Sequence, residues 1–557
     1  MHQYDIVEYV ADGSRGSRNM KHTVRLLCVV VFYFSFFITH ANTTGPLSGK
    51  TFLQPRSVGT NAARELVGWR HYINKKTDKW LYGAFNVTPA YSHTFRPARI
   101  AEYFFGCDTI TISGSQVTNR DTNHMLADYF GLSPTFFSTV KIKPKLKNTS
   151  IDLDLYLGCT SFYVRILAPI NWARSNIELH EIVSNNGNST AFSALYMDTT
   201  SITPPVTSFT EAIRGNITFG DLTEGLDVCK ISECARNEFH VADVHVAAGW
   251  NFISRETGHA GLNLRFVAPT GNRPTGEYMF EPIVGNGHHW EFGFGFTGHV
   301  MVWEYGADRS ISLYTDLNIT HLFDACQRRC FDISIDCCTD MCKQNVSNVA
   351  SRYILVKEFD ANNYIGKLVP LANKTTLNCN VKTGLQFDFV FMVGYTGPMF
   401  NWDFGYNGWI RTKESICITD KLEESTIGLK GLQNVDTGAG NSNATQSNAT
   451  INGNNTGDAT PGLFVNQATL VDATSPIFLK NTDLDRKSAA NPRAFTHKLF
   501  AYIDYHHVTH TCPWINTFFI GAGGEIEFES AHRRRFTKPN KNSLSQWSLW
   551  LKTGVAF

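Results

Sequence analysis

The chain has 557 residues, of which 50 are Lys or Arg and 49 are Asp or Glu, so its net charge is close to zero. This balance argues against a nucleic-acid partner. Aromatic residues reach 13% and charged residues only 18%, while the mean hydropathy of -0.19 excludes a protein built from membrane helices and suits strands that are apolar on one face only.

The first predicted element is an export signal. A basic stretch at 20–25 precedes the apolar run 26–38, and a small-x-small-like end closes on Ala41. This order is typical of a secretory signal peptide, so we expect cleavage after Ala41. We interpret residues 1–19 as an upstream extension that precedes the true start at Met20.

An N-terminal segment without a strand pattern follows at 42–79. Within it, residues 61–69 are predicted to form one short helix. Two alternatives remain open for this segment: a surface helix near the mouth of a barrel, or a plug inside the lumen.

Residues 80–557 consist of segments in which apolar and polar residues alternate at period two, which predicts amphipathic strands. Many approach the length of about ten residues that crosses a membrane as a barrel strand. Counting 140–158 as one tall strand gives 12 strands, whereas dividing it at Lys147 and adding 108–117 gives 14, and we favour 12. The segments are 81–95, 140–158, 162–166, 244–252, 262–268, 290–302, 311–323, 385–393, 400–406, 499–505, 520–528 and 545–557.

The connections between these strands alternate between short and long. The short ones are 159–161, 254–258, 304–308, 395–398 and 508–514, and the long ones are 171–240, 270–288, 324–375, 412–494 and 529–543. Bacterial outer-membrane barrels have short periplasmic turns and long external loops. The sequence therefore predicts an all-β, transmembrane antiparallel barrel. The Asn-rich tract 441–460 in the longest loop is expected to be disordered.

Charged residues that alternate with apolar ones in these strands are expected to face a wet lumen. Both signs occur, which suits a general aqueous pore. The lumen-facing candidates are Lys141, Lys143, Asp152, Asp154, Arg165, Arg265, Glu291, Asp316, Asp388, Asp403, Arg411, Glu525 and Glu527.

Five cysteines crowd one predicted external loop, and they are Cys326, Cys330, Cys337, Cys338 and Cys342. An exported chain meets an oxidising compartment, so we expect disulfides that staple this loop. Their spacing is not that of a zinc ribbon. We expect no metal site, no cofactor and no enzymatic activity, because the chain has neither a nucleophile elbow nor an HExxH motif.

The last strand ends on Phe557 and resembles the closing strand of bacterial outer-membrane β-barrels, whose terminal Phe is read by the assembly machinery. Three blocks, Arg96–Gly106, Leu126–Leu132 and Phe266–Gly287, resemble those of a family of large, mostly uncharacterised, porin-like bacterial outer-membrane barrels. The resemblance runs from about Thr51 to Phe557. It implies an outer-membrane location and contact with lipid and the barrel-assembly machinery, and it leaves a homo-oligomer open. The basic patch Arg533–Arg535 in the last predicted external loop is either a solvated loop or a contact with anionic lipopolysaccharide or a host surface polyanion.

These features predict a porin-like channel that passes small hydrophilic solutes by passive diffusion. The alternative is a closed barrel that acts as a surface adhesin or a structural outer-membrane protein. Glycosylation sequons at Asn188 and Asn216 raise a further rival, a secreted adhesive glycoprotein. A sequon at Asn318, inside a predicted strand, counts against that rival.

Overall fold

The computed structural model describes residues 49–187, 204–333, 350–430, 449–454, 478–508, 515, 517–529 and 544–557, apart from positions 55, 58, 77, 78, 119, 122, 307 and 362. The upstream extension and signal peptide predicted at 1–41 lie outside these residues. Within the described part of the chain, no helix is both long and apolar enough to cross a lipid bilayer.

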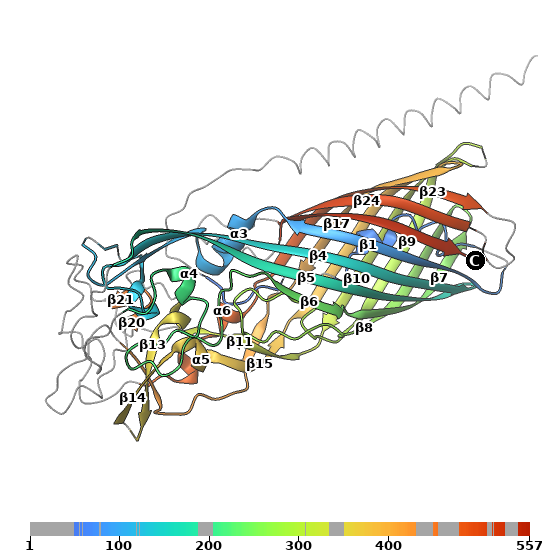
Figure 1. The fold of residues 1–557 in the computed structure, drawn as a ribbon. Coiled ribbons are helices and arrows are strands. Elements are labelled where there is room, and N and C mark those ends of the chain that lie inside the picture. Colours follow the sequence, from blue (N-terminus) through green and yellow to red (C-terminus); the bar gives the residue numbers. More distant parts are fainter. Residues whose placement is uncertain are drawn as a thin grey trace, which may run out of the picture. The chain divides into compact units, whose positions relative to one another are not determined.

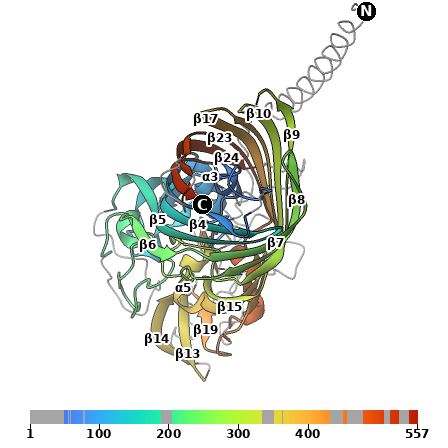
Figure 2. The ribbon, with the colours of Figure 1, turned by 90° about the vertical axis from the view of Figure 1, so that its right-hand side faces the viewer.

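Twelve of the described strands close into one antiparallel barrel (Figures 1 and 2). Each pairs with the next barrel strand in the chain, and the last pairs back with the first, with Ala84 opposite Ala556. The barrel strands are β1 (Tyr82–Thr94), β4 (Phe137–Cys159), β5 (Phe162–Asn185), β7 (Val244–Arg255), β8 (Gly258–Ala268), β9 (Glu291–Glu304), β10 (Ser310–Leu322), β16 (Gly384–Thr396), β17 (Phe400–Arg411), β23 (Ala494–Val508), β24 (Thr517–Glu529) and β25 (Gln546–Ala556).

The predicted antiparallel barrel of 12 strands is thus confirmed, and the count of 14 is wrong. The segment 140–158 lies within a single strand, β4. The other segment needed for 14 forms β2 (Thr109–Ser113), which pairs with the N-terminal end of β4, Thr109 opposite Lys141, and with the two-residue strand β3 (Met125–Leu126), and so lies outside the ring.

Apolar side chains cover the outer face of the barrel. Leu264 is 49% exposed, Phe294 62% and Leu551 56%, whereas inward-facing neighbours such as Asn263, Gly295 and Lys552 are buried. Soluble monomers rarely expose such a continuous apolar surface, so this face suits lipid. Exposed aromatic residues form two bands on this face. The band near one end of the barrel contains Phe162, Trp250, Trp303, Tyr305 and Phe400, and the band near the other end contains Trp172, Phe239, Trp290 and Phe323.

Short turns join the strands at one end of the barrel, here called the turn end. They connect β4 to β5, β7 to β8, β9 to β10 and β16 to β17, as predicted; the turn predicted at 508–514 lies almost wholly outside the described residues. Phe557 lies at this end, at the seam between β25 and β1. Its backbone N–H donates to the carbonyl of Gly83 at 2.9 Å, and the Gly83 N–H donates to the Phe557 carbonyl at 3.0 Å.

Long connections fold together at the opposite end, the loop end, into a cap. We define the cap as the described residues of 95–136, 204–243, 269–290, 323–383 and 412–493. Its helices are α3 (Pro97–Phe105), η1 (Ala127–Phe130), α4 (Phe209–Ala212), η3 (Ser351–Tyr353), α5 (Leu371–Thr375), η5 (Asn481–Asp483) and α6 (Arg486–Ala489). Its strands are β2, β3 (Met125–Leu126), β6 (Arg236–Val241), β11 (Ala325–Cys330), β12 (Asp332–Ile333), β13 (Leu355–Asp360), β14 (Asn363–Pro370), β15 (Thr376–Lys382), β18 (Ser415–Ile418), β19 (Ile427–Leu429), β20 (Ala449–Thr450), β21 (Gly453–Asn454) and β22 (Leu484–Asp485).

The cap has a hydrophobic core of its own, which includes Phe104, Phe136 and Phe331, all 0% exposed. Two loop predictions are corrected by this packing. The loop predicted at 171–240 is shorter, because β5 runs on to Asn185 and pairs with β6. Within the tract predicted to be disordered at 441–460, β20 and β21 form a hairpin whose Ile451 is 1% exposed in the cap core.

Candidate functional site

The described residues of 51–76 run from the cap into the lumen of the barrel, and we call this segment the plug. Near the loop end, the Arg411 guanidinium donates to the Gln54 carbonyl at 2.9 Å. Near the turn end, the Asn74 N–H donates to the Tyr156 hydroxyl at 3.1 Å, and Tyr72 stacks on Phe519 with ring centroids 4.8 Å apart. The plug therefore runs along the lumen from one end to the other.

The plug contains one described helix, α2 (Ala62–Leu66), and its local sequence explains the shape. Asn61 caps the helix by accepting from the Arg64 N–H at 3.2 Å, and the Glu65 carboxylate accepts from the Asn61 N–H at 3.2 Å. After the helix, Gly68 has φ 66°, a left-handed conformation that favours glycine. A Cβ at Gly68 would also lie 2.3 Å from the Tyr502 ring.

Three plug arginines pair with three aspartates of the barrel wall. Arg56 meets Asp388 of β16 at 2.5 Å. Arg64 meets Asp152 of β4 at 2.6 Å. Arg70 meets Asp403 of β17 at 2.6 Å, and both of those side chains are 0% exposed. Because the pairs are buried, breaking one would leave an uncompensated charge in the lumen.

Residues of the barrel wall also form hydrogen bonds with the backbone of α2 and of the residue that follows it. Arg165 pairs with Asp154 at 2.5 Å and donates to the Glu65 carbonyl at 3.0 Å. The Lys552 ammonium donates to the carbonyls of Arg64 and Val67, at 2.6 and 2.9 Å. The polar interior of the barrel is therefore satisfied largely by the plug.

Eleven of the thirteen lumen-facing candidates lie on the inward faces of their strands: Asp152, Asp154, Arg165, Arg265, Glu291, Asp316, Asp388, Asp403, Arg411, Glu525 and Glu527. Besides the three arginine pairs, some of them also bond to residues of the wall and the cap. Glu291 accepts from Asn286 and Thr320 at 2.9 and 3.0 Å, and Glu525 pairs with Lys498 at 3.1 Å.

Lys141 and Lys143, the other two candidates, are a correction, because they lie on the outward face of β4. At this height the inward face carries Val140 and Ile142, which pack in the cap core at 0% and 1% exposed. β4 has 23 residues, about twice the length that crosses a bilayer. Its first half therefore stands beyond the lipid, where water meets the outward face.

The basic residues that neutralise the wall were not predicted from the sequence. They are Arg56, Arg64 and Arg70 of the plug, with Lys498 and Lys552 of the wall. The available signal was an imbalance: of the eleven inward candidates, eight are acidic and three are basic. Buried carboxylates need partners, and the segment before the barrel holds three arginines.

A second buried charge cluster lies where the plug enters from the cap. Arg329 pairs with Glu414 at 3.1 Å, at 0% and 1% exposed, and its guanidinium stacks 3.3 Å from the Phe52 ring centroid. Burial alone would raise the pKa of Glu414. Arg329, Arg411 and hydrogen bonds from Asn491 outweigh it and lower that pKa to about 2.

No family model and no curated protein matches this chain. Solved structures similar to it include an outer-membrane channel from Pseudomonas putida F1, with 9% identity, a TM-score of 0.34, and coverage of 86% of this chain and 97% of that one. A Pseudomonas aeruginosa FadL homologue is 6% identical with a TM-score of 0.24, covering 86% and 90%. An anion-selective porin from Comamonas acidovorans is 6% identical with a TM-score of 0.19, covering 86% and 98%. These likenesses are weak, so the barrel assignment rests on the strand pairings above.

Proposed function

We propose that the chain is an outer-membrane channel for small hydrophilic solutes whose lumen is closed in this structure by the plug. The observation that supports this proposal is the chemistry of the contact between plug and wall. Charged and amide groups line that contact, as in the pairs of Arg56, Arg64 and Arg70 with wall aspartates. Once the plug shifts, the wall would present carboxylates and guanidinium groups to water, which suits polar solutes.

The same proposal places the protein in a bacterial outer membrane, with the turn end in the periplasm and the cap outside. The apolar outer face, the two aromatic bands and the short turns support this orientation. Lipid and lipopolysaccharide would contact the outer face, and the assembly machinery would recognise Phe557. The sequence offers no catalytic motif, so we propose no reaction.

The second candidate is a closed barrel with a structural or adhesive role. The burial of the plug favours it, since Ala63 and Val67 are 0% exposed and the three arginine pairs are enclosed. A plug that never moves would make the barrel a support for the cap rather than a passage.

Conductance in planar bilayers separates the two candidates. The test protein is the triple variant Arg56→Ala, Arg64→Ala, Arg70→Ala. A matched control removes three partly exposed ion pairs with Lys145→Ala, Lys374→Ala and Lys382→Ala. We expect the wild-type protein and the control to stay closed with rare openings, and the triple variant to conduct in discrete steps.

Folding must be checked in the same samples, by resistance to detergent before boiling. A folded triple variant that stays silent would refute the channel and favour the closed barrel. A conducting variant is then tested in liposomes, where swelling in a small sugar would support hydrophilic solutes. No swelling despite ion conductance would contradict that substrate class.

A further inference from the structure

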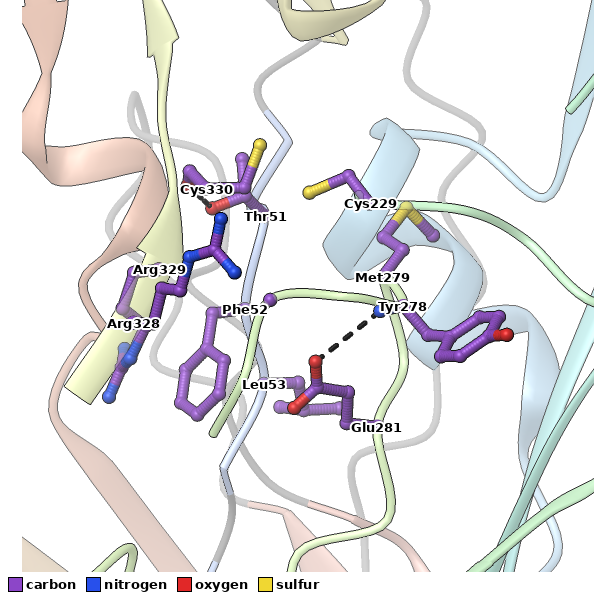
Figure 3. A pocket seen from close by; sticks show the side chains of 11 residues that line it. Thr51, Phe52, Leu53, Cys229, Tyr278, Met279, Glu281, Arg328, Arg329 and Cys330 are labelled. Carbon is purple, nitrogen blue, oxygen red and sulfur yellow. Dashed lines mark hydrogen bonds between the residues drawn. The ribbon is translucent and has the colours of Figure 1, made fainter. Parts of the chain in front are cut away.

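Cys229 and Cys330 meet in the cap although 100 residues separate them in the chain. Cys330 ends β11, and Cys229 lies in the segment that precedes β6. Both line one small cavity and both are buried, at 1% and 2% exposed. Figure 3 shows their sulfur atoms pointing toward each other across this cavity.

Hydrogen bonds anchor the backbone at both cysteines. The Tyr353 hydroxyl donates to the Cys229 carbonyl at 2.7 Å, and Thr51 Oγ1 donates to the Cys330 carbonyl at 2.5 Å. Nearby, Arg352 pairs with Asp332 at 3.0 Å, with both side chains at 2% exposed or less. The backbone carbonyls of both cysteines are therefore hydrogen-bonded within the structure, and the two side chains line the same cavity.

The two thiols are also chemically unequal. Burial and the hydrogen bond with Cys330 raise the pKa of the Cys229 thiol. Burial acts the same way on Cys330, but the hydrogen bond with Cys229 and the nearby Arg352 outweigh it and lower its pKa. A lowered pKa leaves a larger fraction of Cys330 as the thiolate, which is the attacking form in disulfide exchange.

We propose that Cys229 and Cys330 are joined by a disulfide bond in the exported protein. The structure holds both as free thiols. The inference rests on the proposed export to an oxidising compartment, where such bonds form and persist.

The oxidant would be a protein disulfide of that compartment, acting before the cap closes over the pair. The Cys330 thiolate attacks one sulfur of the oxidant and displaces the other as a thiolate, which gives a mixed disulfide. Cys229 then loses its proton and attacks the Cys330 sulfur, releasing the oxidant as a dithiol. Two S–H bonds are lost and one S–S bond forms. The oxidant gains two electrons and the two protons.

The bond would fasten the entrance of the plug. Thr51, the first residue of the plug, donates to the Cys330 carbonyl. Phe52 lies against Arg329, which precedes Cys330 in β11. Linking Cys330 to Cys229 would therefore tie three parts of the cap together: the segment before β6, the strand β11 and the first residues of the plug. The pairing also differs from the expected staple within the loop, whose Cys337, Cys338 and Cys342 lie outside the described residues.

The test is peptide mapping of the full-length protein taken from the outer-membrane fraction. The unreduced protein is denatured, its free thiols are alkylated with iodoacetamide, and it is digested with trypsin and a protease that cleaves before Asp. These cuts release Asp227–Lys230 and the dipeptide Cys330–Phe331, each with a single cysteine. We expect the two joined in nearly all copies and separated by a reductant.

Alkylated Cys229, or Cys229 joined to any other cysteine, would overturn the disulfide while leaving the outer-membrane location intact. Protein found only in the cytosol would instead overturn the proposed function. Cys229→Ala and Cys234→Ala form a matched pair, because Cys234 is exposed in the same segment. Cys330 should become free for alkylation in the first variant only, and an alkylated Cys330 in the second would contradict the proposal.

Discussion

Arg70 has the most enclosed side chain of the three plug arginines. Besides Asp403, its guanidinium donates to the Tyr395 carbonyl at 2.7 Å and to the Thr396 hydroxyl at 3.2 Å. Arg70→Ala would leave the Asp403 carboxylate buried without its partner, at a cost of about 3–5 kcal/mol. We expect a lower temperature for loss of the folded form on a detergent gel.

Lys145→Ala is the control for Arg70→Ala. The pair of Lys145 with Glu178 is partly exposed, at 34% and 30%, so its loss costs about 0–1 kcal/mol. The control should lose its folded form at nearly the wild-type temperature. Equal temperatures for both variants would show that the buried pair does not stabilise the barrel.

Glu414 should make the cap sensitive to acid. Its pKa is about 2 in the folded protein against 4.5 normally. Because the folded value is the lower one, the stabilisation is complete above about pH 4.5 and is lost as the pH falls toward 2. The shift corresponds to about 3 kcal/mol. We expect pepsin to cleave the wild-type cap increasingly across this window.

In Glu414→Gln, the cap should be cleaved by pepsin faster than the wild-type cap at pH 4.5, and its cleavage should change less between pH 4.5 and 2. Glu423→Gln, at an exposed position of the same connection, should retain the wild-type profile. A wild-type cap whose cleavage does not change between pH 4.5 and 2 would contradict the role given to Glu414.

At the scale of single elements, the seam between β1 and β25 depends on a glycine, Gly83, which leaves room for the Phe557 ring. A Cβ at Gly83 would lie 2.6 Å from the Phe557 ring and 2.7 Å from the Tyr156 carbonyl oxygen. Gly83→Ala should therefore unseat Phe557 and lower the fraction of membrane protein in the folded, heat-modifiable form. Gly298→Ala is the control, because its nearest atom lies 3.2 Å away in a flexible Phe296 side chain. Equal folded fractions would exclude this role for Gly83.

The hairpin of β20 and β21 gives a test of the cap. Ile451 is buried in the cap core at 1% exposed, and its carbonyl accepts from the Leu126 N–H at 2.9 Å. Ile451→Ala should destabilise the cap by about 2–5 kcal/mol. Faster cleavage of the cap by a protease at neutral pH would report this loss.

Ile365→Ala makes the same change at a 45% exposed position of β14, where the expected effect is within about 0.5 kcal/mol. If both isoleucine variants are cleaved at the wild-type rate, the hairpin does not contribute to the cap core.

The barrel strands were predictable because apolar residues recur at every second position along each of them. Leu262, Leu264 and Phe266 meet lipid while their neighbours face the lumen, so alternation alone identifies the strand. β4 shows where this reasoning fails. Its odd-numbered residues face outward throughout, yet Leu153 faces lipid and Lys141 faces water. Alternation identifies the two faces of a strand. Whether the outward face is apolar depends on whether that part of the strand lies at the level of the lipid.

The cap was not predictable in the same way. Its strands are short, such as β12 with two residues and β19 with three, and their pairing partners lie far apart in the chain. No local period marks such strands. Burial of Ile451 likewise depends on contact with Leu126, more than three hundred positions away.

For the whole molecule, ring closure predicts resistance to detergent. Every barrel strand is paired on both sides, so no edge is left from which the sheet can fray. We expect the unboiled protein to migrate as a compact form in a detergent gel and to shift on boiling. Identical migration before and after boiling would contradict a closed barrel.

The plug could be inferred only in part from the chain. The absence of a strand pattern at 42–79 left two places open for this segment, and the eight inward carboxylates called for more cations than the three inward arginines among the candidates supply. The arginines that supply them, Arg56, Arg64 and Arg70, carry no pattern of their own. Their partners lie on three different strands, which only the closed ring brings together.

The seam has a consequence for how the chain tolerates errors in its own synthesis. β1 finds its second partner in β25, whose pairing runs from Gln546 to Ala556, the last residues before Phe557. A premature stop anywhere before these residues would not produce a narrower barrel. It would leave β1 as an open edge around a half-enclosed plug, a template for aggregation. Closure of the ring therefore requires β25, and a chain truncated before this strand cannot form the closed barrel.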